Sequence, residues 1–243
     1  MSPGQKFFAA TMAGIGILGL VQGGFTPSWS GVPRSFPGRE YVAWLCAVVS
    51  LLCGLGMLWK RSAVVASRAL LGFLLFWLVV VRVYGLVRYP GLGTFLSIGD
   101  TAAMAGAAWV LYARLAGDTR LRIARVLYGF GMIPLGVAHF INFKGTAALV
   151  PGWLPWHEAF AFLTGCAFIA AGVAIIIGVQ ARLAATLSAL QMGLFLLLVW
   201  VPVVLAGANA GQWQEFVGSW VLMAAGWAVA DSYAGGLLEP LVA

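Results

Sequence analysis

Long runs of apolar residues dominate the chain, and their lengths restrict its fold more than any other feature. There are eight such runs, each about 17 to 25 residues long. A helix needs about 20 apolar residues to cross the hydrocarbon core of a bilayer, and it satisfies its own backbone hydrogen bonds there. Only 9% of the residues are charged, which is too few to cover the surface of a water-soluble domain. The sequence therefore predicts an all-α integral membrane protein with eight transmembrane helices, near residues 7–23, 40–59, 64–88, 97–115, 123–143, 157–178, 183–205 and 215–231.

The second half of the chain repeats the pattern of the first. Residues 32–40 read V-P-R-S-F-P-G-R-E and residues 150–158 read V-P-G-W-L-P-W-H-E, so one frame of valine, prolines and glutamate recurs 118 residues later. Other residues keep nearly the same spacing, and the matched pairs are Gly14 and Gly129, Gly16 and Gly131, Gly54 and Gly172, Gly72 and Gly193, and Met104 and Met223. This register indicates a tandem duplication. We expect two four-helix bundles, at residues 7–115 and 123–233, which should be parallel because each has an even number of spans.

Basic residues flank the apolar runs unequally. Nine Lys and Arg residues lie on the side of the N-terminus and five on the other side. Because cytoplasmic flanks are the richer in Lys and Arg, we expect an inner-membrane protein with both termini in the cytoplasm. The net charge of +7 comes mostly from these cytoplasmic Lys and Arg residues, which anionic membrane lipids would attract. Nothing in this charge distribution requires nucleic acid as a partner. The first run resembles a signal peptide, but its glycines have counterparts in the fifth run, so we expect it to belong to the folded protein.

Charged residues near the outer ends of the spans are the first candidates for a binding site. Helix capping would explain four acids near the starts of inward-running helices without any chemistry, and a role in a site is the alternative; the four are Glu40, Asp100, Glu158 and Glu215. Arg82 differs from them, because it precedes Arg88 by six residues and so lies about 9 Å deeper along its helix. We expect Arg82 to snorkel, to pair with Glu40 or Asp100, or to face a substrate. Arg39, Glu40 and Arg82 are therefore ligand-binding candidates in the first copy.

The two histidines distinguish the second copy from the first. His139 and His157 lie near the outer side, at the end of the fifth run and the start of the sixth. With Glu158 and Lys144 nearby, they are candidates for proton transfer or anion binding, and Trp153 would lie at the rim of such a site. A structural role for both imidazoles is the alternative. Their spacing does not match a zinc site, so the sequence predicts no metal.

Several motifs of the second copy are similar to one known family. They are G-V-A-H-F at 136–140, A-A-L-V-P-G-W-L-P-W at 147–156, L-T-G at 163–165, I-A-A-G at 169–172 and A-R-L-A-A at 181–185. The chain thereby resembles the DoxX/DoxD-like membrane proteins, most strongly over residues 129–205. The resemblance implies two fused four-helix units and a role beside quinone-linked oxidation, as in the small subunit of a thiosulfate:quinone oxidoreductase. This chain departs from the family's commoner pattern, since Thr164 stands near the position of a glutamate in the second helix.

Two functional classes follow from these observations. In the first, the protein is a membrane subunit of a quinone-linked redox system, with His139, His157 and Glu158 as proton acceptors and other redox subunits as partners. In the second, it is a non-catalytic membrane scaffold or carrier whose polar residues only cap helices and anchor loops. The chain has no complete catalytic motif or cofactor fingerprint, so the sequence specifies no cofactor, and a quinone is a candidate. A lipid-modifying enzyme would need more polar residues at mid-span than Gln191 and Arg82 provide.

Overall fold

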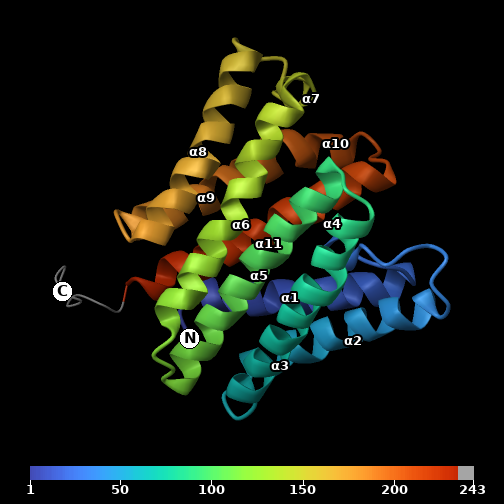
Figure 1. Ribbon diagram of the computed structural model, residues 1–243, viewed down its shortest axis with the longest axis vertical. Helices are drawn as coiled ribbons and strands as arrows, with labels where there is room; N and C mark the ends of the chain where they lie inside the picture. The colour runs from blue at the N-terminus through green and yellow to red at the C-terminus, as the bar shows by residue number, and fades with distance from the viewer. Residues whose placement is uncertain (235–243) are drawn as a thin grey trace.

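The computed structural model describes residues 1–234, and these are folded almost entirely into helices, with no strand among them. The helices are α1 (Pro3–Gln22), η1 (Pro27–Trp29), α2 (Arg39–Leu58), α3 (Ala63–Phe76), η2 (Trp77–Val83), α4 (Tyr84–Arg88), α5 (Leu92–Ala116), α6 (Leu121–Ile141), α7 (Phe143–Ala148), α8 (His157–Ile177), α9 (Ala181–Phe195), η3 (Leu196–Trp200), α10 (Val201–Leu205) and α11 (Ala210–Ser232). Figure 1 shows their course from the N-terminus to the C-terminus. The predicted all-helical class is confirmed.

Seven helices of the described chain are long and apolar enough to cross a membrane. Two of them are composite: α3, η2 and α4 form one span over Ala63–Arg88, and α9, η3 and α10 form another over Ala181–Leu205. Both contain a π-helical segment, η2 or η3, shortly before the last helical turns. The helix α11 covers the eighth apolar run with 23 residues but is not among the seven. The structure thus has the character of a multi-pass membrane protein.

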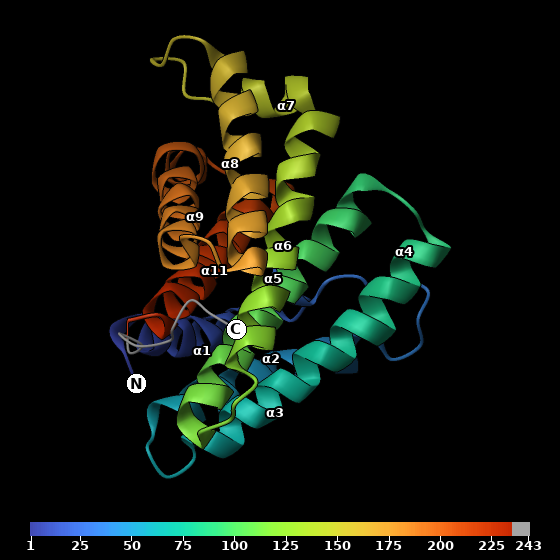
Figure 2. The same ribbon diagram turned by 60° about the vertical axis from the view of Figure 1, so that its left-hand side comes forward.

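The long helices pack in a closed circuit. In the first half α1 contacts α2, α2 contacts α3, and α3 contacts α5. In the second half α6 contacts α8, α8 contacts α9, and α9 contacts α11. Two further contacts, of α5 with α6 and of α11 with α1, join the halves, and α5 also touches α11 across the circuit. Figures 1 and 2 show that the helices fan out, so that α6 and α8 rise steeply away from α1 and α2.

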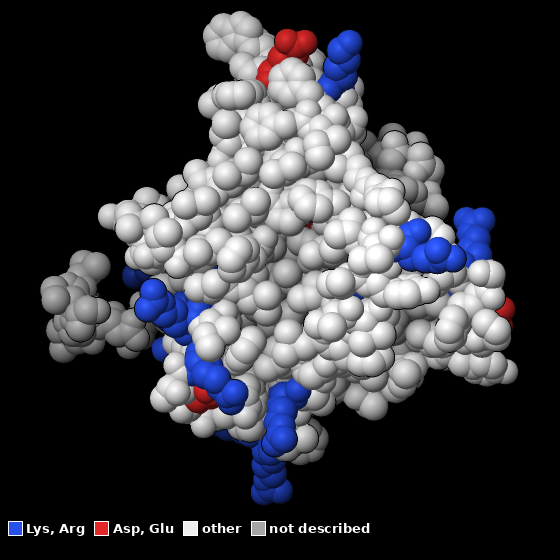
Figure 3. Space-filling view, in the orientation of Figure 1, with Lys and Arg blue, Asp and Glu red and all other residues white. Residues whose placement is uncertain are grey.

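Hydrogen bonds tie three helix ends together on one side of the molecule. The amide of Gly4, in the first turn of α1, donates to Oδ2 of Asp231 near the end of α11 at 2.7 Å. Arg125, near the start of α6, donates to Ser232 and stacks on the ring of Tyr233. Figure 3 shows the basic side chains around the periphery of the molecule, with a broad uncharged face between them. This distribution suits a protein whose middle lies in hydrocarbon.

Glycines let neighbouring helices approach closely in both halves. A Cβ added to Gly54 on α2 would lie 2.7 Å from the Cα of Ala13 on α1. In the second half, a Cβ on Gly172 of α8 would lie 2.7 Å from the carbonyl oxygen of Gly129 on α6. Lipid provides no hydrophobic drive for helix association, so such close packing is what holds membrane helices together. Gly54 and Gly172 are one of the pairs that the repeated sequence pattern matches.

Candidate functional site

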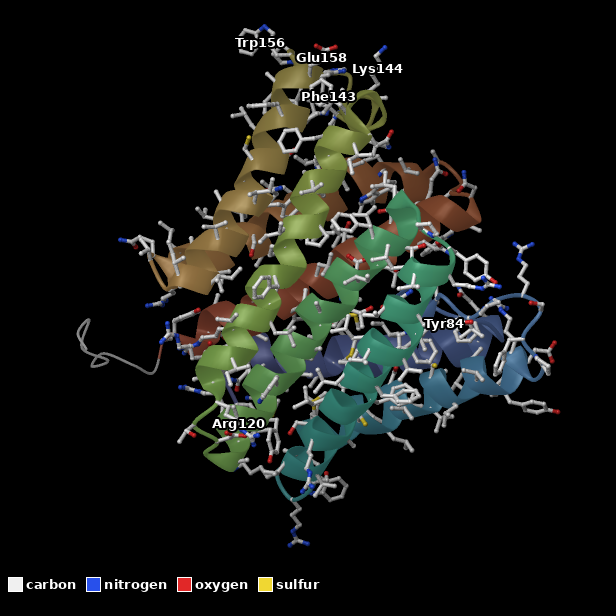
Figure 4. The ribbon with its side chains drawn as sticks, in the orientation of Figure 1. Tyr84, Arg120, Phe143, Lys144, Trp156 and Glu158 are labelled. Atoms are coloured by element: carbon white, nitrogen blue, oxygen red, sulfur yellow. The ribbon has the colours of Figure 1, made fainter. Side chains whose placement is uncertain are left out.

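The tip of the second half formed by α7 and the start of α8 carries four of the eight sequence-predicted site residues. Figure 4 shows Lys144, Trp156 and Glu158 at this tip, where α7 and the start of α8 lie, at the far end of α6 from Arg120. Lys144 and Glu158 are exposed, and 70% of Trp153 is exposed as well. His157, the first residue of α8, is partly exposed. These side chains therefore face the surroundings of the protein.

His139 lies deeper, inside the second half. Its ring packs against Phe168 of α8 and Phe195 of α9, with centroids 5.4 Å and 6.0 Å away. A Cβ on Gly165 would lie 2.9 Å from the Cβ of His139, so the two residues are level with each other. Gly165 is eight residues along α8 from His157, a distance of about 12 Å.

The structure therefore does not bring the two imidazoles together, although the sequence suggested that they could meet. The reason is the connection between their helices. The helix α6 ends at Ile141, and the chain then forms α7 and a loop before α8 begins at His157. The start of α8 consequently lies farther out than the end of α6.

The hydrogen bond of His139 defines which of its ring nitrogens can meet a ligand. Nδ1 lies 2.8 Å from the carbonyl oxygen of Leu135. A carbonyl only accepts, so Nδ1 carries the proton and Nε2 of the neutral ring keeps its lone pair. Nearby, Gln191 of α9 donates to the carbonyl oxygen of Thr164 on α8 at 3.0 Å, one helical turn from each phenylalanine. The hydroxyl of Thr164 bonds within its own helix, so no carboxylate stands beside His139 at this position.

In the first half, Arg82 is turned inward from the π-helical segment η2 and is only 3% exposed. Its Nε donates to Oγ1 of Thr101 at 3.0 Å, its Nη1 to Oγ of Ser30 at 3.3 Å, and its Nη2 to the carbonyl oxygen of Ser28 at 3.0 Å. Of the three alternatives expected for Arg82, snorkelling into water does not fit this burial. The guanidinium reaches toward the loop between α1 and α2 and toward α5.

The ion pair suggested for Arg82 is not formed either. Within residues 1–234, neither Glu40 nor Asp100 is in ion-pair contact with Arg82, although Asp100 acts on it electrostatically from a greater distance. Glu40 is exposed in the first turn of α2, where it favours the helix N-terminus. Arg39 has a structural contact, since its Nε donates to the carbonyl oxygen of Val32 and its guanidinium lies over the ring of Phe25.

A groove of about 620 Å³ opens beside Arg82. We call it the Arg82 groove, and its lining residues are Ser30, Gly31, Pro33, Arg34, Ser35, Val81, Arg82, Gly85, Tyr89, Gly93, Thr94 and Ser97. Sequence reasoning identified Arg82 and missed the groove. The available signal was the cluster of small and hydroxyl-bearing residues in two segments of the first half, the loop between α1 and α2 and the start of α5.

Comparison with known proteins gives no relative, since no family model, no curated protein and no solved structure matches the chain. The fold alone defines the class of protein. Over residues 1–234 the chain is an apolar, all-helical protein of multi-pass membrane character, in which Arg82 is buried in the first half and His139 faces inward in the second.

Proposed function

We propose that the protein consists of two tandem four-helix units, residues 7–115 and 123–233, with α11 as an eighth span. The matched glycines at helix contacts and the same order of neighbours in each half support this arrangement. The joined ends of α1, α6 and α11 support an even number of crossings in each unit. With the excess of Lys and Arg on that side, both termini are cytoplasmic and the protein belongs to the inner membrane.

Thiol labelling in intact cells tests this topology. Arg61, in the loop between α2 and α3, and Trp153, in the loop before α8, are both exposed and lie at opposite ends of the spans. In a background with Cys166 replaced by alanine, we expect an impermeant maleimide to label Trp153→Cys from outside and Arg61→Cys only after permeabilisation. The buried Cys46 and Cys53 should not react. Labelling of Arg61→Cys in intact cells would contradict the proposed orientation.

For the function, the protein is best described as a DoxX-like membrane subunit of a quinone-linked redox system. One observation carries this proposal: the Nε2 lone pair of His139, inside the helical part and between two phenylalanine rings of other helices. A quinol hydroxyl can donate to Nε2, which can then hold the proton as the quinol is oxidised. The phenylalanines supply the apolar and aromatic contacts that a quinone ring needs. Electrons would pass to a partner subunit of the redox complex.

A non-catalytic membrane scaffold or carrier is the second candidate function. It is favoured by the exposed positions of Lys144 and Glu158, which leave them to contact lipid headgroups and water at the tip. His139 would then be a packing residue whose ring is satisfied by Leu135 and the two phenylalanines.

Matched histidine substitutions separate the two candidates. The change His139→Phe keeps an aromatic ring among Phe168 and Phe195 but removes the acceptor, whereas His157→Phe makes the same change at the outer tip. We expect His139→Phe to weaken binding of a short-chain ubiquinone or menaquinone analogue about tenfold, the value of one good hydrogen bond. His157→Phe should bind as the wild type does. Quenching of tryptophan fluorescence by the analogue measures the affinity.

Thermal unfolding of both variants is the control for folding. If His139→Phe binds the analogue as tightly as the wild type, the scaffold or carrier is the better description. The same conclusion follows if the affinity falls only in step with the midpoint of unfolding.

A further inference from the structure

The Arg82 groove has an excess of positive charge. Arg82 and Arg34 both line it, and no acidic residue does so in the described part of the chain. The three oxygens that accept from Arg82 are neutral, so they hold the guanidinium in place without neutralising it. Asp100 offsets the charge only from beyond ion-pair distance. A buried charge without a close partner is costly, and an anion that enters the groove would be stabilised by both arginines.

The guanidinium of Arg82 is held in one position. Oγ1 of Thr101 donates to the carbonyl oxygen of Ser97 at 2.8 Å, which leaves a lone pair of Thr101 for Nε of Arg82. On the other side, the backbone at Gly31 has a φ of +110°, and a Cβ there would lie 2.9 Å from Nη1. The three bonds use one N–H group on each nitrogen, so Nη1 and Nη2 each keep another N–H for a ligand. Because Arg82 also lines the groove, its guanidinium is a preformed donor group at this cavity.

The surroundings of the groove indicate what kind of anion it takes. Arg82 lies six residues before the outer end of the span Ala63–Arg88, about 9 Å inside it. The same stretch of helix exposes Val83, Tyr84 and Val87 on its outer surface, where acyl chains of the bilayer would lie. An anionic group that binds Arg82 beside such a surface is therefore best carried by an amphiphile, whose apolar part can lie against the exposed side chains.

We infer that the Arg82 groove binds the phosphate group of an anionic phospholipid from the outer half of the bilayer, with its acyl chains along the exposed face of η2 and α4. The inference is independent of His139 and of quinone binding. The corresponding stretch of the second half carries no arginine, because the residues 119 to 121 positions after Arg82 are Val201, Pro202 and Val203.

Lipid binding by the full chain, purified in a neutral detergent, tests this inference. Native mass spectrometry would count the bound molecules of phosphatidylglycerol. Phosphatidylcholine, which is zwitterionic, tests the need for a net negative charge, and inorganic phosphate tests whether a soluble anion binds in the same place. We expect one phosphatidylglycerol per chain, bound about tenfold more tightly than phosphatidylcholine and not displaced by inorganic phosphate at a similar concentration. Arg82→Gln should abolish the preference, and Arg34→Gln should weaken it about fivefold.

The matched control is Arg88→Gln, which removes an exposed charge from the same end of the same span but outside the groove. It should bind phosphatidylglycerol as the wild type does. Because Arg34 is exposed, its variant gives a result even if Arg82→Gln does not fold. Equal affinities of Arg34→Gln, Arg88→Gln and the wild type would refute the site. Displacement by inorganic phosphate would refute the assignment to a lipid.

Discussion

Replacing Gly54 by alanine should lower the midpoint of thermal unfolding, whereas the same replacement at Gly72 should leave it unchanged or raise it. An alanine Cβ at position 54 would lie 2.7 Å from the Cα of Ala13 and 2.8 Å from the carbonyl oxygen of Ala9, so α1 and α2 must move apart. Overpacking of this kind costs about 1 to 3 kcal/mol, or roughly 3 to 10 °C for a chain of this size. At Gly72 the added Cβ would have no atom within 4 Å apart from its chain neighbours and the backbone of its own helix.

The pair of variants is informative because both make one chemical change inside a long helix. Alanine is favoured over glycine in a helix interior by about 1 kcal/mol, so propensity alone predicts that both variants gain stability. Only the contact between α1 and α2 predicts opposite signs. Unfolding in detergent, followed by tryptophan fluorescence, measures the two midpoints. Equal shifts would mean that the close approach at Gly54 contributes nothing to stability.

Replacing Trp29 by alanine should have the largest effect of any single change considered. Trp29 is fully buried, and its ring packs against Phe73 at 5.0 Å and Trp77 at 5.5 Å between centroids. Its Nε1 donates to Oγ of Ser50 at 2.7 Å, which fixes the loop between α1 and α2 to α2. Loss of such a side chain costs about 3 to 5 kcal/mol. The free energy of unfolding in a mild denaturant series measures the loss.

Two further variants show which part of the Trp29 environment matters. Trp29→Phe keeps most of the ring contacts and loses the hydrogen bond, so it should be destabilised by about 1 kcal/mol or more. Trp153→Ala, at a residue that is 70% exposed, should be close to neutral. If Trp29→Ala were no less stable than Trp153→Ala, the loop would not be anchored as described.

The positions of the helices follow closely from run lengths, because a membrane span is defined by how many apolar residues cross the bilayer. The run 40–59 becomes α2 at Arg39–Leu58, and the run 157–178 becomes α8 at His157–Ile177. The π-helical segment η2 has no such signal, since apart from Arg82 the stretch Trp77–Val83 is as apolar as the rest of its span. The sequence therefore located Arg82 along its helix and could not give the direction of its side chain.

The contacts of the polar residues were harder to predict than their positions. Charge alone suggested Glu40 or Asp100 as partners for Arg82, yet its partners are neutral oxygens. One of them is a backbone carbonyl, and since every residue has such a carbonyl, the sequence does not show which one accepts. For the histidines, a short connection suggested proximity. The position along α8 that His139 contacts is determined instead by its packing against Gly165 and Phe168. No local sequence pattern predicts this packing.

The contact of α1 with α11 also determines when the molecule can close during synthesis. Trp220 of α11 donates to Thr11 of α1 across 209 residues of sequence, and the bond between Gly4 and Asp231 spans 227. At the usual rate of about 5 to 20 residues per second, α1 leaves the ribosome roughly 10 to 40 s before its last partner. During that interval α2 can cover only one side of α1. The first helix made is therefore among the last to be fully enclosed, and until then its remaining surface is open to lipid or to the insertion machinery.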